Sequence, residues 1–113
     1  MLTVVVIGSQ PAAMNDVQVL ACTDDPRRAP RLVDDLRPQV VLAGLNGNRD
    51  AVLAVVPEVV KRVPDTPVLA VADAAGDVLA AVHAGAAGYV VAPDDAEALA
   101  DAVRRTAAGE AVF

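Results

Sequence analysis

The sequence of 113 residues has almost no aromatic side chains: one tyrosine, one phenylalanine and no tryptophan. A core must therefore be built from Val, Leu and Ala, and hydrophobic residues make up 55% of the chain. That fraction allows a sizeable core and argues against intrinsic disorder. The only cysteine, Cys22, excludes an internal disulfide and is typical of a protein from a reducing compartment.

Long apolar runs are also absent. No run reaches the ~18 apolar residues of a membrane-spanning helix. Met1 leads directly into a short apolar segment, without the basic residues that begin a signal peptide. We therefore expect a cytoplasmic protein without a membrane partner.

Positive charge is scarce. Nine basic residues against fifteen acidic ones give a net charge of −6 at pH 7. Nucleic-acid binding requires cationic side chains that neutralise phosphates. We therefore expect no direct contact between this domain and nucleic acid.

Five short apolar runs have the length of β-strands. They cover residues 2–7, 17–21, 40–43, 68–71 and 89–91. Because these runs do not alternate apolar and polar residues, they predict strands buried on both faces, as in a parallel sheet. The length of the chain fits a single domain, residues 1–113.

Two helices are predicted in the first half. Leu32, Val33 and Leu36 have the spacing of a short helix that Pro30 opens. Residues 51–63 carry a valine stripe with a period of about 3.6 residues. Pro57 lies in the middle of that stripe, so it must kink the helix or delay its start.

Two further helices are predicted in the second half. Val78, Leu79 and Val82 mark the third helix, which Gly85 or Gly88 ends. The last helix has the clearest ends. Asp94 is expected as its N-cap with Glu97 three residues on, Leu99 and Val103 face inward, Arg104 and Arg105 occupy the last turn, and Gly109 follows.

The alternation of strands and helices predicts an α/β three-layer sandwich with right-handed crossovers. One connection is too short for this pattern. Only residues 9–16 separate the first two strands, whereas a crossover with its helix needs at least ~10–12 residues. The first helix is therefore expected to be missing or reduced to a turn.

Three segments carry a resemblance to a known family: "RPQVVLAGL", "PDTPVLAVAD" and "AGAAGYVVAPDDAEALADAVRRTAAGEAVF". Their order and spacing resemble a response-regulator receiver domain, in particular receivers that precede a LuxR-type helix-turn-helix output domain. The resemblance covers residues 2–8 and 17–113. It implies a CheY-like fold with five parallel strands in the order 2-1-3-4-5.

The resemblance also implies a chemistry that this sequence lacks. Receivers of this family take a phosphoryl group from a histidine kinase onto an aspartate, using an acidic pair that holds Mg²⁺, a hydroxyl and a lysine. These positions of the phosphorylation pocket fall on Gly8 and Ser9, Gly44, Ala72 and Ala92. None supplies the group that the family uses. We therefore expect no catalytic residue, no metal ligand, no cofactor and no enzymatic activity.

Other polar residues have a simpler interpretation. Asp50 is a candidate substitute acceptor, but an acid in the first turn of a helix is the favoured interpretation. The pair Asp24 and Asp25 resembles a metal pair, and an N-cap or solvated turn is favoured. His83 is interpreted as a helix-surface residue, and Cys22 as a small hydrophobe that ends a strand.

The leading hypothesis is an atypical receiver, or pseudo-receiver, that acts in signal transduction or transcriptional regulation by protein–protein contact. Its partners are expected to be a second copy and an attached or associated output domain. The family pairs through a face that falls here at about residues 76–108. The candidate interface residues are Val82, His83, Tyr89, Ala98 and Ala102. Tyr89 matches the family's switch aromatic, and we interpret it as a static packing or interface residue.

Two other functions remain open at this point. A small molecule could replace the phosphate in the vacated pocket lined by Gly8, Gly44 and Ala72. A non-standard aspartate could still accept phosphate in a phosphorelay. The alternative surface for a dimer is the sheet face left uncovered where the first helix should lie.

Overall fold

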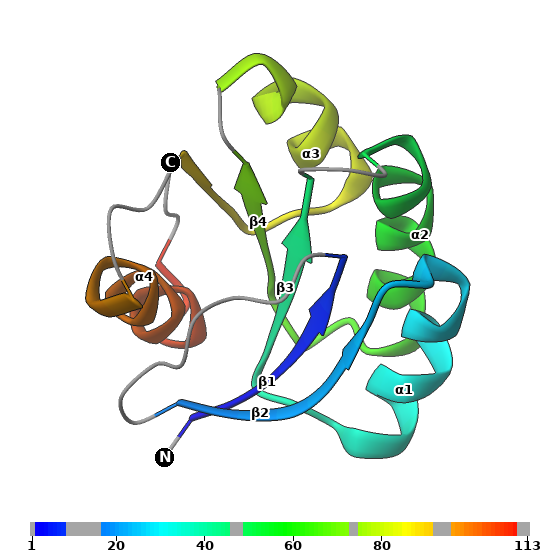
Figure 1. The fold of residues 1–113 in the computed structure, drawn as a ribbon, viewed down its shortest axis with the longest axis horizontal. Helices are drawn as coiled ribbons and strands as arrows, with labels where there is room; N and C mark the ends of the chain where they lie inside the picture. The colour runs from blue at the N-terminus through cyan, green and yellow to red at the C-terminus, as the bar shows by residue number, and fades with distance from the viewer. Residues whose placement is uncertain (1, 9–16, 46–48, 73–74, 92–95, 111–113) are drawn as a thin grey trace.

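The computed structural model describes residues 2–8, 17–45, 49–72, 75–91 and 96–110 (Figure 1). Strands and helices alternate over most of this length. In chain order the elements are β1 (Leu2–Ile7), β2 (Val17–Thr23), the 3₁₀ turn η1 (Pro26–Arg28), α1 (Ala29–Leu36), β3 (Val40–Gly44), α2 (Arg49–Arg62), β4 (Val68–Ala72), the 3₁₀ turn η2 (Ala75–Asp77), α3 (Val78–Ala84), β5 (Gly88–Val91) and α4 (Ala96–Ala107).

The five strands form one parallel sheet in the order β2-β1-β3-β4-β5. Helices α1, α2 and α3 cover one face, and α4 lies on the other (Figure 1). The predicted fold class and strand order are therefore confirmed. The segment expected to lack the first helix, residues 9–16, lies outside the described residues.

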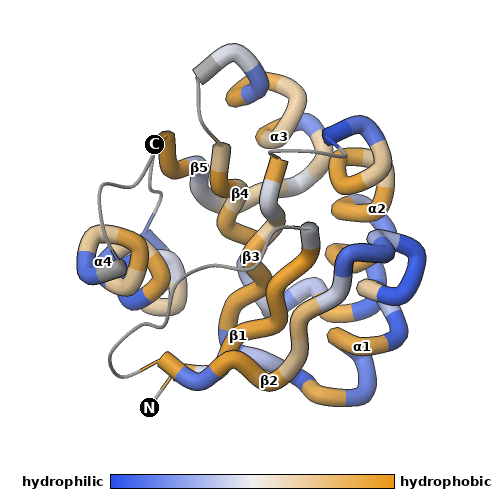
Figure 2. The backbone as a smooth tube through the Cα atoms, viewed as in Figure 1, coloured by the Kyte–Doolittle hydropathy of each residue, from blue (hydrophilic) through white to orange (hydrophobic). Residues whose placement is uncertain are grey.

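Two apolar clusters sandwich the sheet. The first, which we call the α1–α3 core, includes Val5 and Ile7 of β1 and the valine stripe of α2. The second, the α4 core, includes Val4 and Val6 of β1 together with Leu99 and Val103 of α4. Successive residues of a strand point to opposite faces, so an uninterrupted apolar run fills both cores. Figure 2 shows this apolar centre across β1, β3 and β4.

The pairing of β1 with β2 contains a bulge. Val4 pairs with Val19 and Val5 pairs with Ala21, so Leu20 is the extra residue. Leu20 consequently packs against the α1–α3 core. Val19 pairs with a residue of the α4 core and is 41% exposed, so an apolar side chain is left uncovered on the α4 side of the sheet.

Helix α2 departs from the prediction at its proline. It begins at Arg49, well before Pro57, and continues to Arg62, so of the two predicted effects of Pro57, a kink or a late start, the late start is wrong. Pro57 lacks the N–H that would bond to the carbonyl of Leu53. Burial of the stripe compensates for this loss, because four valines of α2 are 8% exposed or less: Val52, Val55, Val56 and Val59.

Helix α3 has the predicted position, and its buried side includes a residue that the apolar pattern did not mark. Ala81 is buried, whereas Leu79 is 70% exposed and Val82 is 41% exposed. Gly85 ends the helix with a φ of 117°, a left-handed conformation that favours glycine. Of the two glycines predicted to end α3, Gly85 is therefore correct, and Gly88 begins β5.

Helix α4 matches the prediction where it is described. Leu99 and Val103 are buried, and Arg104 and Arg105 occupy the last turn. The expected N-cap, Asp94, lies outside the described residues. No helix in the described ranges is long and apolar enough to cross a membrane.

Because β3 is buried on both faces, shortening one of its side chains should strongly lower the free energy of unfolding. Leu42, at 1% exposure, lies in the α4 core. We expect Leu42→Ala to lower the free energy of unfolding by about 3 kcal/mol, because it leaves a cavity between two packed layers. Urea denaturation followed by circular dichroism measures the change. Leu79→Ala is the matched control and should change stability by less than about 0.5 kcal/mol; equal losses for the two variants would contradict this assignment of the core.

Candidate functional site

Three of the predicted pocket positions lie together where β1, β3 and β4 end, along the edge of the sheet formed by the carboxyl ends of the strands. Ile7 pairs with Ala43 and Gly44 pairs with Val71, so Gly8, Gly44 and Ala72 lie at this edge. Ligands of open α/β sheets bind outside the carboxyl ends of the strands. The other two predicted positions, Ser9 and Ala92, lie outside the described residues.

Gly8 has a geometry that only glycine tolerates. Its φ is 94°, and its N–H donates to the carbonyl oxygen of Thr23 at 2.9 Å. A Cβ atom built on Gly8 would lie 2.7 Å from the carbonyl oxygen of Gly44, closer than real Cβ atoms come to backbone. An aspartate here would therefore require the ends of β1 or β3 to move.

The two other described pocket positions, Gly44 and Ala72, are covered by packed atoms. Gly44 is buried and Ala72 is 3% exposed. The chain continues from β3 into Leu45, whose N–H donates to the carbonyl oxygen of Val71 at 2.8 Å. At this edge, Gly8, Gly44 and Ala72 thus present backbone and apolar atoms, with no carboxylate or hydroxyl of their own.

Asp50 has the role expected of an acid at the start of a helix. It lies in the first turn of α2, and its side chain is 90% exposed. Nη1 of Arg49 donates to its Oδ1 at 2.7 Å. Asp50 therefore interacts with the helix terminus and an arginine, as the favoured interpretation predicted.

Asp25 caps the 3₁₀ turn η1. Its side chain accepts from the backbone N–H of Arg27 and, through both oxygens, from the guanidinium of Arg27 at 3.1 and 3.3 Å. These hydrogen bonds lower the pKa of Asp25. The N-cap interpretation is confirmed for Asp25. Within the described ranges, no group of three or more His, Cys, Asp or Glu side chains could hold a metal ion.

A polar contact that the sequence did not reveal joins α2, η2 and β5. Nε of Arg49 donates to Oδ1 of Asp77 at 2.5 Å. The backbone of Asp77 is hydrogen-bonded to the hydroxyl of Tyr89, and burial raises the pKa of Tyr89. Arg49 and Asp77 are 28 positions apart, and no local pattern links them. The contact holds the aromatic side chain beneath α3.

Two of the five predicted interface residues are buried in the monomer. Tyr89 is 3% exposed because it faces the α1–α3 core from β5. Ala102 is 6% exposed because it shares the sheet-facing side of α4 with Val103. Neither lies on the surface where the sequence placed it. Val82, His83 and Ala98 are exposed as predicted.

An apolar surface remains beside these residues. Among the described large hydrophobic residues, five are well exposed, and three of them belong to α3 and β5: Leu79, Val82 and Val91. We call these three residues the α3–β5 patch. Val91 and Tyr89 are two positions apart in β5 and point to the same face. Tyr89 itself is a packing residue of the α1–α3 core.

Comparisons with known proteins place this geometry in a structural context. No protein-family model matches the sequence, and no curated protein matches it. The chain is similar to a LuxR-family two-component response regulator from Aurantimonas sp. SI85-9A1, with 22% identity, a TM-score of 0.81, and coverage of 99% of this chain and 89% of that one.

Two further solved structures have the same architecture. The signal receiver domain of the putative response regulator NarL from Mycobacterium tuberculosis is 23% identical, with a TM-score of 0.79 and coverage of 96% and 98%. The chemotaxis protein CheY4 from Vibrio cholerae is 19% identical, with a TM-score of 0.73 and coverage of 93% and 98%. At these identities the likeness establishes the fold: the chain has the CheY-like fold of response-regulator receiver domains.

Proposed function

We propose that this chain is a pseudo-receiver, which regulates an output by protein–protein contact without being phosphorylated. The observation that carries the proposal is the contact between Gly8 and Gly44, where a Cβ would lie 2.7 Å from a carbonyl oxygen. By the resemblance, these are the positions of a metal-binding acid and of the phosphoacceptor. The backbone now occupies the space that an acidic side chain needs.

The fold supports a role in signal transduction. The similar structures are response regulators or their receiver domains, and several are named as LuxR-family or NarL proteins. We propose that the chain works in the cytoplasm as a non-enzymatic regulator of an attached or associated output domain, in transcriptional regulation. A ligand-responsive receiver is less well supported, because Gly44 and Ala72 are both buried.

The first test is chemical. We expect no gain of a phosphoryl group after incubation with acetyl phosphate and Mg²⁺, because the described strand ends offer no carboxylate to bind the metal or accept phosphate. Intact-mass spectrometry measures the outcome. A receiver with an intact acidic pocket, treated in parallel, shows that the reagents are active. A stoichiometric gain of one phosphoryl group would overturn the proposal.

The second test concerns Tyr89. Because burial raises the pKa of this tyrosine, we expect it to ionise at higher pH in the folded protein than in urea. The neutral form is favoured in the folded state, so its contribution to stability is present below the ordinary tyrosine pKa and is lost as pH rises through the folded pKa. Ultraviolet difference titration reads this directly, since the chain has one tyrosine and no tryptophan.

Acetyl phosphate with Mg²⁺ should leave this titration unchanged. The proposal holds that Tyr89 is a fixed packing residue rather than a switch. An ordinary tyrosine pKa in the folded protein, or a change of the titration curve with the phosphodonor, would contradict a fixed inward position.

The working state is proposed to be a symmetric homodimer formed through the α3–β5 patch. The patch gathers exposed apolar side chains from two neighbouring elements, and exposed Ala98 of α4 flanks β5 from the other layer. Association would remove this apolar surface from water. A contact of this kind needs no phosphate, so the dimer would be constitutive.

Sedimentation velocity at micromolar concentration tests the dimer. We expect the parent protein to be dimeric and Leu79→Asp or Val82→Asp to be monomeric, because each places a charge in an apolar contact. Leu36→Asp is the matched control, since Leu36 is a 39% exposed apolar residue on α1, outside the patch. A monomeric parent would contradict the proposal. A dimer insensitive to both patch variants would move the interface to the α4 side of the sheet, near Val19.

A further inference from the structure

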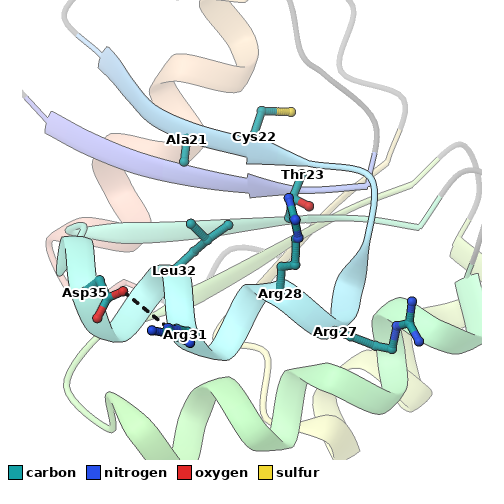
Figure 3. Close-up of a pocket in the computed structure, with 8 residues that line it drawn as sticks. All are labelled: Ala21, Cys22, Thr23, Arg27, Arg28, Arg31, Leu32 and Asp35. Carbon is teal, nitrogen blue, oxygen red and sulfur yellow. Dashed lines mark ion pairs between the residues drawn. The ribbon is translucent and has the colours of Figure 1, made fainter.

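A groove lies between the edge strand β2 and helix α1, away from the strand-end site. Its cavity has a volume of about 530 Å³. The strand contributes Ala21, Cys22 and Thr23, and the helical side contributes Leu32, three arginines and one acid, Asp35 (Figure 3). Volumes of this order accommodate ligands of a few hundred daltons or a short peptide segment.

The groove concentrates positive charge in an acidic chain. Three of the nine basic residues, Arg27, Arg28 and Arg31, fall within five positions, although the net charge is −6. Arg27 is bonded to Asp25 and points away from the groove (Figure 3). Arg31 is 3.9 Å from Asp35, and both side chains are largely exposed, so this ion pair contributes little.

Arg28 is available to a ligand. No ion pair is formed by Arg28 within the part of the chain that the structure describes. Its guanidinium extends from the helical side toward Thr23 at the end of β2 (Figure 3). An arginine fork can bind a carboxylate through two parallel hydrogen bonds.

The strand side of the groove offers backbone groups. β2 pairs with β1 alone and is the outermost strand of the sheet. The outer edge of such a strand presents N–H and C=O groups that another strand can bind. Leu32 and Ala21 add an apolar floor, so the groove combines a strand edge, an apolar surface and cationic side chains.

We propose that this groove binds an acidic peptide segment of a partner protein, which adds to β2 as an extended strand. Arg28 and Arg31 are three positions apart on α1 and its N-terminal turn, and such residues have Cβ atoms about 5–6 Å apart on a helix. Alternate side chains of a strand are about 6.6 Å apart on one face. Acidic residues at alternate positions would therefore each face one arginine. A free anion would leave the strand edge unused, so the peptide is the better occupant.

The probe is a blocked peptide of about eight residues, a common strand length, that alternates Glu and Val. We expect saturable binding by fluorescence anisotropy and shifts of the amide resonances of Ala21, Cys22 and Thr23. A peptide of the same length that alternates Lys and Val should not bind.

The charge requirement is tested with paired variants. Arg28→Glu with Arg31→Glu should weaken binding at least about tenfold, because both carboxylate contacts become repulsive. The matched control is Arg104→Glu with Arg105→Glu on α4, whose arginines form surface ion pairs of 3.8 Å, about as long as that of Arg31. Each pair of changes takes the net charge from −6 to −10, since every Arg→Glu exchange subtracts two charges. The control pair should change affinity by no more than about twofold.

The strand requirement is tested with methylated peptides. Alternate N–H groups of a strand point to opposite edges. N-methylation of all Val amides or of all Glu amides should therefore abolish binding in one peptide and spare it in the other.

The proposal is overturned by the absence of saturable binding, by equal losses in the two arginine pairs, or by equal affinity of both methylated peptides. Equally tight binding of citrate would also overturn it, in favour of a site for small anions. The proposal does not depend on the absence of phosphorylation, so the two can fail separately.

Discussion

The rest of the structure depends on the burial of β1 and β3 from both sides. Val4 to Ile7 and Val40 to Ala43 are all 2% exposed or less, because helices cover both faces of the sheet. Such strands can carry no polar side chain along their length without a buried partner. Chemistry is consequently possible only beyond their ends, where the chain leaves the sheet. The absence of tryptophan and near absence of phenylalanine is compatible with this design, since two thin layers of valine fill the space.

At the carboxyl ends of β1 and β3, the backbones of Gly8 and Gly44 lie too close for a side chain at Gly8. A receiver-like site needs carboxylates that stand apart and hold a cation between them. Here, a positive-φ glycine brings the end of β1 against the backbone of β3. The molecule thus has the CheY-like fold, while the backbone of Gly44 fills the space that a side chain at Gly8 would need. The described residues offer two outer surfaces of opposite character: the α3–β5 patch, and the groove beside β2 that carries three arginines.

Local patterns predicted most of the architecture. Short apolar runs predicted all five strands, with β1 at its observed bounds. Two-sided burial explains this for β1 and β3, but the prediction that every strand is buried on both faces is wrong for β2, where Gln18, Val19 and Cys22 are exposed. Periodicity also predicted the buried stripe of α2. Periodicity did not predict which side chains of each helix face the core. In α3, Leu79 is exposed, and the smaller Ala81 is buried.

The candidate site was predictable in its composition but not in its geometry. Sequence position identified Gly8 and Gly44, whereas their backbone contact depends on how two strands end in space. The same is true of Arg49 and Asp77, which tertiary structure brings together across 28 positions. Tyr89 and Ala102 were expected at an interface because the pairing face of the family falls at about residues 76–108, yet both are buried. A difference of one position on a strand or helix is enough to reverse that assignment.

The bulge at Leu20 has a consequence for how the chain finds its native alignment. Val4 and Val6 of β1 are two positions apart and both lie in the α4 core, so a slide of β2 by two positions would meet the same kind of side chain, and packing on this face distinguishes such alignments poorly. Leu20 breaks this degeneracy: it is longer than its neighbours, it is the extra residue between two paired positions, and it packs against the α1–α3 core. A shift of β2 along β1 would move the side chain of Leu20 away from its packing site against the α1–α3 core. One irregular residue thus supplies alignment information that the repetitive strands around it lack.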